Sequence, residues 1–240
     1  MNKTLEPPPV AERPQPRPDP YHHGDLRAAC IVAGLKLVAS GGPDAVTIRG
    51  VARLVGVSHT APLHHFRDRD DLLNGIAEAG FDRLLVAAGE ASTSSEIAPI
   101  ERIRRYCLAY IRVAIGSPGL YRLMFGEAAR GTGNAAYDLL IRLTAESGLS
   151  VGDPEPVALV LWAQVHGLAG LYAEGKLAGE LEGLVPGQVP IRAEEALDRV
   201  IAALILLSKS RHRSRWRSHK RTHPRQVEAT NAGLPGLASS

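Results

Sequence analysis

Residues 46–69 constrain the fold of this chain most strongly, because they contain two helix signals separated by one glycine. Apolar residues recur at helical spacing at Ile48, Val51, Ala52 and Val55. Thr47 precedes them as a suitable N-cap, and Gly56 ends the helix, since glycine adopts the left-handed conformation at little cost. Ser58 is placed to cap a second short helix. Two short helices joined in this way form a helix-turn-helix, whose second helix enters the major groove of DNA.

The rest of the chain also carries helical patterns, and no run alternates apolar and polar residues long enough to require a strand. We expect a first helix over 25–40 and a long helix from a cap at Asp68, with Asp71 as its partner, to about residue 91. Further helices are predicted over residues 99–115, 120–128, 135–147, 157–177 and 193–207. The predicted fold class is all-α, with a three-helix helix-turn-helix domain followed by a helical ligand-binding and dimerisation domain.

Composition divides the chain into four segments. We expect a disordered Pro-rich arm over 1–20, the helix-turn-helix domain over 21–85, the second helical domain over 86–208 and a basic, disordered tail over 209–240. The tail has eight Lys or Arg and one Glu, whereas the whole chain has a net charge of +3, so the rest is net negative. The tail is either a solvated extension or a cationic arm that adds salt-sensitive DNA affinity.

The helices over 157–177 and 193–207 are apolar nearly all the way round. Such helices must be covered on two sides. We expect one side to face the domain core and the other a second subunit, which gives a four-helix bundle across a two-fold axis. A fully intrachain core is the alternative.

Several features favour a cytoplasmic protein. Gln164 and His166 interrupt the longest apolar window, so a membrane span is not expected. The N-terminus is polar and has no apolar signal region. Cys30 and Cys107 each lie in an apolar helical run, and two such thiols fit a reducing compartment.

Three stretches, L-V-A-S-G-G, T-I-R-G-V-A-R-L-V-G-V-S and H-F-R-D-R-D-D-L-L, resemble the N-terminal DNA-binding domain of the tetracycline-repressor (TetR) family. The later segment L-W-A-Q-V-H-G-L-A-G-L is similar to the ligand-binding half of one branch, which carries a Trp-x-x-x-His-Gly pattern. The resemblance implies an all-α homodimer that binds a pseudo-palindromic double-stranded DNA operator, usually as a repressor released by a small molecule.

The residues that follow the turn are the candidates for DNA contacts. His59, Thr60 and Ala61 are the first residues able to reach base edges, and family position adds Arg49. Phosphate contacts are predicted for Thr47, Ser58, His64 and Arg69. The family usually has a tyrosine that touches phosphate where this chain has Leu63, so that contact is lost unless His64 or the basic tail replaces it. His65 and Phe66 match family core positions and are predicted to pack inside.

Ligand-pocket candidates are polar or aromatic residues on otherwise apolar helices. They are Tyr106, Tyr110, Tyr121, Phe125, Trp162 and His166. The simpler alternative is that Trp162 and His166 only hold helices together. No charged cluster accompanies these residues, which favours a neutral or apolar effector.

The sequence does not indicate an enzyme. Cys107 and His166 have no recognisable catalytic partners, and there is no phosphate-cradling glycine loop. The adjacent histidine pairs at 22–23 and 64–65 lack the i, i+4 spacing of a helical metal site, so we expect no metal and no cofactor. The predicted function is a sequence-specific transcriptional regulator; the alternative is a non-specific, nucleoid-type DNA-binding protein that uses the basic tail.

Overall fold

The computed structural model describes residues 25–92, 94–126, 135–150 and 152–222, with side chains up to residue 210. These ranges contain α-helices and short 3₁₀ segments and no strand, so the predicted all-α class is confirmed. The predicted Pro-rich arm and the last part of the basic tail, from residue 223, lie outside the described residues.

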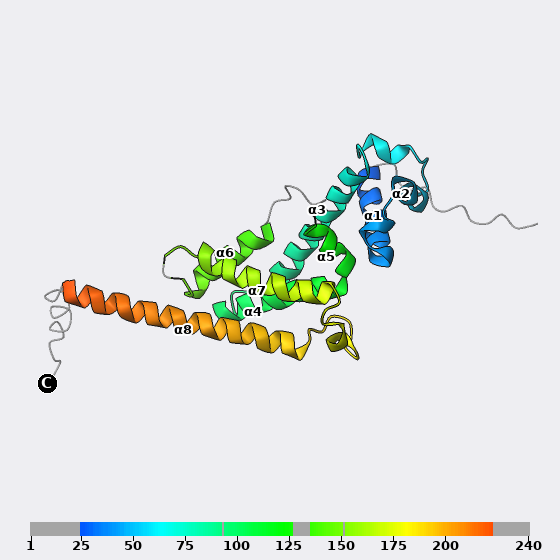
Figure 1. The fold of residues 1–240 in the computed structure, drawn as a ribbon. Helices are drawn as coiled ribbons and strands as arrows, with labels where there is room; N and C mark the ends of the chain where they lie inside the picture. Colours follow the sequence, from blue (N-terminus) through cyan, green and yellow to red (C-terminus); the bar gives the residue numbers. More distant parts are fainter. Residues whose placement is uncertain (1–24, 93, 127–134, 151, 223–240) are drawn as a thin grey trace, which may run out of the picture.

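The N-terminal domain forms one end of the molecule (Figure 1). Its elements are α1 (Leu26–Gly41), η1 (Pro43–Ala45), α2 (Ile48–Val55), η2 (Ala61–His64) and the start of α3 (Arg69–Ser92). α1 begins as predicted, because the Asp25 carboxylate accepts a hydrogen bond from the Ala28 N–H at 2.9 Å. The buried side chains of these elements form one apolar core that includes Cys30, Val38, Val46, Val51, Phe66, Leu72 and Ile76.

The second domain is built around a central helix. Its elements are α4 (Pro99–Gly116), α5 (Pro118–Met124), α6 (Ala135–Ser147), α7 (Glu155–Ala173), η3 (Ala178–Leu181) and α8 (Ile191–Thr222). α4 packs against α3, α5, α6, α7 and α8. α8 runs along one side of the domain, and its C-terminal part extends beyond α6 (Figure 1).

Three predicted helix ends were wrong. The helix predicted over 120–128 is α5, which ends at Met124. α7 ends at Ala173 instead of residue 177, because Gly175 adopts a left-handed conformation with φ of 73° and turns the chain away. The tail was predicted to be disordered from residue 209, but α8 continues to Thr222. A helix already nucleated by packing extends at little cost through Arg, Lys and Ser, and cations at its C-terminal end complement the helix dipole.

Two helices join the domains. α3 begins in the N-terminal core, and the same helix packs on α4 in the second domain. α5 packs on α1 and η1 as well as on α4 and α7. Gly119 permits the close approach of α5 to α1, since a Cβ at this position would lie 2.7 Å from the Val38 carbonyl oxygen. The N-terminal domain therefore rests directly on a helix of the second domain.

Candidate DNA-binding surface and effector site

The first helix of the helix-turn-helix and its turn have the predicted geometry. The Thr47 hydroxyl accepts a hydrogen bond from the Gly50 N–H at 2.9 Å and caps α2. Gly56 has φ of 80° and ψ of 29°, and its N–H donates to the Ala52 carbonyl at 2.9 Å. Both predictions, the Thr47 cap and the left-handed Gly56, are confirmed.

The segment after the turn is a four-residue 3₁₀ helix, η2, and Ser58 does not cap it. The Ser58 carbonyl accepts the Ala61 N–H at 3.0 Å, so that N–H is not free to bond the hydroxyl. The Ser58 Oγ lies 3.4 Å from the Thr60 hydroxyl instead. The predicted Ser58 cap is therefore wrong. Pro62 is buried and supplies the carbonyl to which the Phe66 N–H donates at 3.0 Å, which fixes η2 against the core.

The predicted DNA contacts gather on this one unit. Arg49 on α2 and His59, Thr60 and His64 around η2 are exposed, and Ala61 is half-buried beside them. Thr47 and Ser58 are exposed at the starts of α2 and of the segment after the turn. The unit lies at the end of the molecule farthest from α8 (Figure 1).

Arg69 has a role that the sequence did not indicate. Its Nε donates to the Val46 carbonyl at 2.8 Å, and a terminal nitrogen donates to the Pro43 carbonyl at 2.8 Å. These bonds tie the start of α3 to the connection that leads into α2. Two of the five guanidinium N–H donors are therefore already engaged within the domain.

The start of α3 is capped as predicted. The Asp68 Oδ1 accepts the Asp71 N–H at 2.8 Å, and the Asp71 carboxylate accepts the Arg67 N–H at 3.0 Å. The Arg67 side chain donates to the same carboxylate, and this contact lowers the pKa of Asp71.

His65 and Phe66 differ from one another in burial. Phe66 is buried, as predicted. His65 is exposed, so the prediction that it packs inside is wrong, because Pro62 and Phe66 already fill the inward positions.

A cluster of rings, which we call the ring cluster, brings together five of the six predicted pocket residues. They are Tyr110 of α4, Tyr121 of α5, Phe125 directly after it, and Trp162 and His166 of α7. The ring centroids of Phe125, Trp162 and Tyr121 lie 4.5, 5.4 and 5.7 Å from that of His166. Phe125, Trp162 and His166 are half-buried, so one side of the ring cluster is accessible.

Hydrogen bonds converge on His166. The hydroxyls of Tyr110 and Tyr121 lie 2.9 and 2.8 Å from its Nδ1, and the Tyr121 hydroxyl also donates to the His166 carbonyl at 3.1 Å. Burial lowers the pKa of His166 and so favours the neutral imidazole. Burial raises the pKa of Tyr110 to about 12, although hydrogen bonds from Tyr121 and Trp162 oppose this shift. The ring cluster is therefore an uncharged site with hydroxyl and imidazole groups.

Tyr106 lies apart from the ring cluster. It is fully buried, and its hydroxyl donates to the Ala136 carbonyl at 2.8 Å, which ties α4 to α6. Two rings that the sequence did not indicate border the ring cluster instead. Phe81 of α3 packs edge-on against Phe125 at 5.3 Å, and Tyr137 of α6 lies 5.4 Å from Trp162. Both come from other helices, so no local spacing could have identified them.

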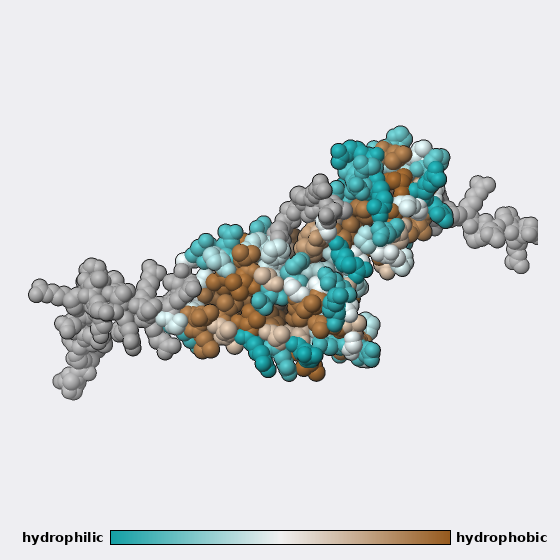
Figure 2. Space-filling model, in the orientation of Figure 1, coloured by the Kyte–Doolittle hydropathy of each residue, from teal (hydrophilic) through white to brown (hydrophobic). Residues whose placement is uncertain are grey.

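An apolar face, which we call the α7–α8 face, is formed by exposed side chains of these two helices. Its large members are Leu159, Val160 and Leu171 on α7 and Leu206 and Leu207 on α8. A groove of about 380 Å³ runs between the helices and is lined by small and apolar residues such as Ala163, Gly167 and Ala196. Figure 2 shows apolar residues gathered over this part of the molecule.

Within the described residues, α7 is long and apolar enough to cross a membrane by length and composition, with a mean hydropathy of 1.3. Core helices of soluble proteins share this length and composition. Only 33% of the apolar window is buried within one chain, so much of the helix still requires a cover.

Comparison with known proteins identifies both domains. The family described as "Bacterial regulatory proteins, tetR family" matches residues 31–76, and "Tetracyclin repressor-like, C-terminal domain" matches residues 103–204. A solved protein with unknown function from Rhodococcus sp. RHA1 is 31% identical, with a TM-score of 0.61 over 78% of this chain and 97% of that one. The chain belongs to the TetR family. It is a DNA-binding transcription regulator with a helix-turn-helix domain.

Two further solved TetR proteins have the same fold. TetR from Acinetobacter baumannii AYE is 19% identical, with a TM-score of 0.58 over 76% of this chain and 97% of that one. A TetR transcriptional regulator from Streptomyces coelicolor is 18% identical, with a TM-score of 0.55 over 77% and 96%. No curated protein sequence matches the chain. Regulators of the TetR family are DNA-binding proteins and generally not enzymes.

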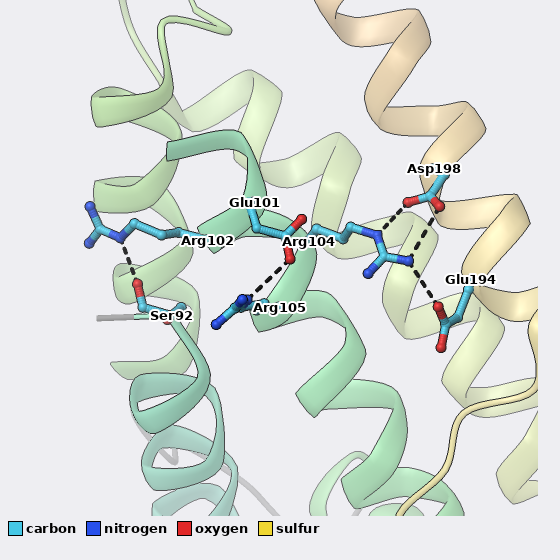
Figure 3. A network of polar contacts seen from close by, with 7 residues as sticks. All are labelled: Ser92, Glu101, Arg102, Arg104, Arg105, Glu194 and Asp198. Atoms are coloured by element: carbon cyan, nitrogen blue, oxygen red, sulfur yellow. Dashed lines mark hydrogen bonds and ion pairs between the residues drawn. The ribbon is translucent and has the colours of Figure 1, made fainter. Parts of the chain in front are cut away.

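In this TetR chain, arginines of α4 hold its neighbours in place (Figure 3). Arg104 donates to both carboxylate oxygens of Asp198, at 2.7 and 3.3 Å, and to Glu194 at 2.9 Å. The hydrogen bonds that Arg104 donates to Asp198 raise the pKa of Arg104 further. Arg102 donates to the Ser92 carbonyl at 2.6 Å and pairs with Glu146. The first of these networks fixes the position of α8, and with it the α7–α8 face.

Proposed function

We propose that this TetR regulator is a ligand-responsive repressor that binds a pseudo-palindromic operator as a homodimer in the cytoplasm. We also place it in the branch with the Trp-x-x-x-His-Gly pattern, which Trp162, His166 and Gly167 fit. The observation that carries the proposal is the unit formed by α2, the turn and η2. Its polar side chains point outward. Its backbone is held in place by the helix cap and by buried residues.

Base reading is assigned to Arg49, His59, Thr60 and Ala61, because they follow helix starts or the turn and are wholly or partly exposed. Phosphate contacts are assigned to Thr47, Ser58, His64 and Arg69. Arg69 contributes less than the other three, since two of its donors already bond carbonyls. Phosphate contacts fix the register on DNA, so the base-reading residues decide the sequence.

The α7–α8 face supports the homodimer. Five large apolar side chains exposed on two adjacent helices form a surface that a monomer in water would leave uncovered. A second copy related by a two-fold axis covers it with the same face. The ion pairs of Arg104 hold α8 against α4, so the face is fixed in position before the second copy binds.

The ring cluster supports the effector site. It consists of uncharged rings and hydroxyls, which suit a neutral or apolar small molecule with one or two polar atoms. Another TetR of this fold, from A. baumannii, was solved with minocycline bound. Tyr121 lies on α5 and Phe125 follows it, while Gly119 at the start of α5 packs on α1. A ligand that displaces α5 would therefore shift the DNA-binding domain.

Selection of bound duplexes from random DNA, at a fixed salt concentration, tests the proposal. We expect enrichment of one palindromic sequence whose half-sites lie about 34 Å, or a multiple of this, apart on the helix. Arg49→Ala should abolish the enrichment while leaving the thermal unfolding unchanged. Binding without enrichment would contradict the proposal and support the non-specific, nucleoid-type alternative.

A further inference from the structure

An exposed leucine lies among the polar residues of the unit formed by α2, the turn and η2, which we call the DNA-facing unit. Leu63 of η2 is 48% exposed, although its neighbours His64 and His65 are polar and also exposed. The inward positions of this segment are taken by Pro62 and Phe66, which are buried. Leu63 therefore points away from the core of its own domain.

The conformation of η2 places Leu63 beside a predicted base-reading residue. The Leu63 N–H donates to the Thr60 carbonyl at 3.0 Å, which is the hydrogen bond of a 3₁₀ turn. Side chains three residues apart lie above one another in this conformation, so Thr60 and Leu63 share one edge of η2. This edge carries the side chain of Thr60, which includes a methyl group, and the half-exposed isobutyl group of Leu63.

The major groove offers one apolar partner to such an edge. Bases display hydrogen-bond donors and acceptors there, and only thymine adds a methyl group at C5. We propose that Leu63, together with the Thr60 methyl, reads a thymine methyl group in each half-site and is a specificity-determining residue of this regulator. The inference rests on the proposed operator binding.

Replacement of thymine by deoxyuridine removes only the methyl group and therefore tests the contact directly. In the duplex selected from random DNA, each thymine of a half-site is replaced in turn, and the dissociation constant is measured for the wild type and for Leu63→Ala. Burial of one methyl group corresponds to about a fourfold change in affinity. Replacing the contacted thymine in both half-sites should therefore weaken wild-type binding roughly 15-fold. Leu63→Ala keeps only the Thr60 methyl in this contact, so its affinity should fall much less than that of the wild type when the contacted thymine is replaced by deoxyuridine.

Leu54→Ala is the matched control. Leu54 is 54% exposed on α2, outside η2, and its variant should keep the wild-type preference for thymine. Leu63→Met should also keep much of the preference, because its side chain is apolar and of similar reach. Circular dichroism verifies that each variant is folded.

The outcomes separate the two proposals. If no sequence is enriched from random DNA, the proposed function fails, and this inference fails with it. If a sequence is enriched but every deoxyuridine replacement acts equally on the wild type and Leu63→Ala, the function stands and the assignment of Leu63 is wrong. A half-site without thymine would overturn the assignment as well.

Discussion

The DNA-facing unit and the ring cluster place their polar groups in opposite ways. Around η2, the side chains of His59, Thr60 and His64 project into solvent from a fixed backbone. In the ring cluster, the hydroxyls of Tyr110 and Tyr121 turn inward to His166. The first region therefore lacks only its external partner. In the second, the hydrogen bonds are already made within the protein, so an effector of the kind we propose would have to replace them and would thereby act on α5.

The largest effect is expected at the α7–α8 face, because the proposed dimer contact there brings two DNA-facing units together. Leu171→Glu places a charge in the α7–α8 face, and each dimer would bury it twice without a partner. We expect the dimer dissociation constant to rise by at least about 100-fold, with a further loss of operator affinity because the half-sites are no longer linked. Sedimentation equilibrium and operator titration measure both effects.

Val185→Glu is the control for this change. Val185 is 57% exposed in the connection between α7 and α8 and does not line the groove. The control variant should remain dimeric. A dimeric Leu171→Glu protein would show that the second copy binds elsewhere.

The turn of the DNA-facing unit depends on the conformation of Gly56. A Cβ at φ of 80° is strained even though nothing blocks it in space, so Gly56→Ala should lower the free energy of unfolding by about 1 kcal/mol. Gly116→Ala also meets open space but at an ordinary φ, and it should be neutral or slightly stabilising. Urea unfolding compares the two; equal effects would refute the role assigned to Gly56.

The hydrogen bonds of the ring cluster should be worth about 1 kcal/mol each. Tyr121→Phe and His166→Phe are expected to be non-additive, because they remove the same contact, whereas Tyr106→Phe and His166→Phe should add, since Tyr106 bonds Ala136 instead. Unfolding measurements on the single and double variants provide the test. Additivity in both pairs would mean that Tyr121 and His166 do not interact in solution.

Acid should destabilise the ring cluster. Because burial lowers the pKa of His166 in the folded chain, the associated stability is present above about pH 6.5, the usual value for unfolded histidine, and is lost as pH falls towards the folded value. The wild type should therefore lose stability between pH 7 and 5 that His166→Gln does not lose, as urea unfolding at each pH would show. His65→Gln, at an exposed position, should behave like the wild type.

The two regions also differ in how far the sequence could predict them. Thr47 and Gly56 act through bonds to residues three or four positions away, so local spacing was enough. The Ser58 cap failed because a carbonyl of the same residue competed for the Ala61 N–H. The two carbonyls bonded by Arg69 lie more than 20 positions earlier in the chain, beyond the reach of any local pattern.

In the ring cluster, the sequence could nominate rings on apolar helices but could not pair them. The contacts of Tyr110 and Tyr121 with His166 span 56 and 45 positions, and they exist only because α4, α5 and α7 pack together. Phe81 was missed for the same reason. The continuation of α8 to Thr222 was missed because the basic segment has no apolar face of its own, and its helix extends from the one predicted over residues 193–207.

We propose that the unit of α2, the turn and η2 reads a DNA sequence. This is tested by the ratio of affinities for the selected palindrome and for a scrambled duplex of equal length, both measured at the same salt concentration. We expect a ratio of about 10³ or more, which falls towards one in Arg49→Ala. A ratio near one in the wild type would contradict the proposal, because binding would then depend on charge alone.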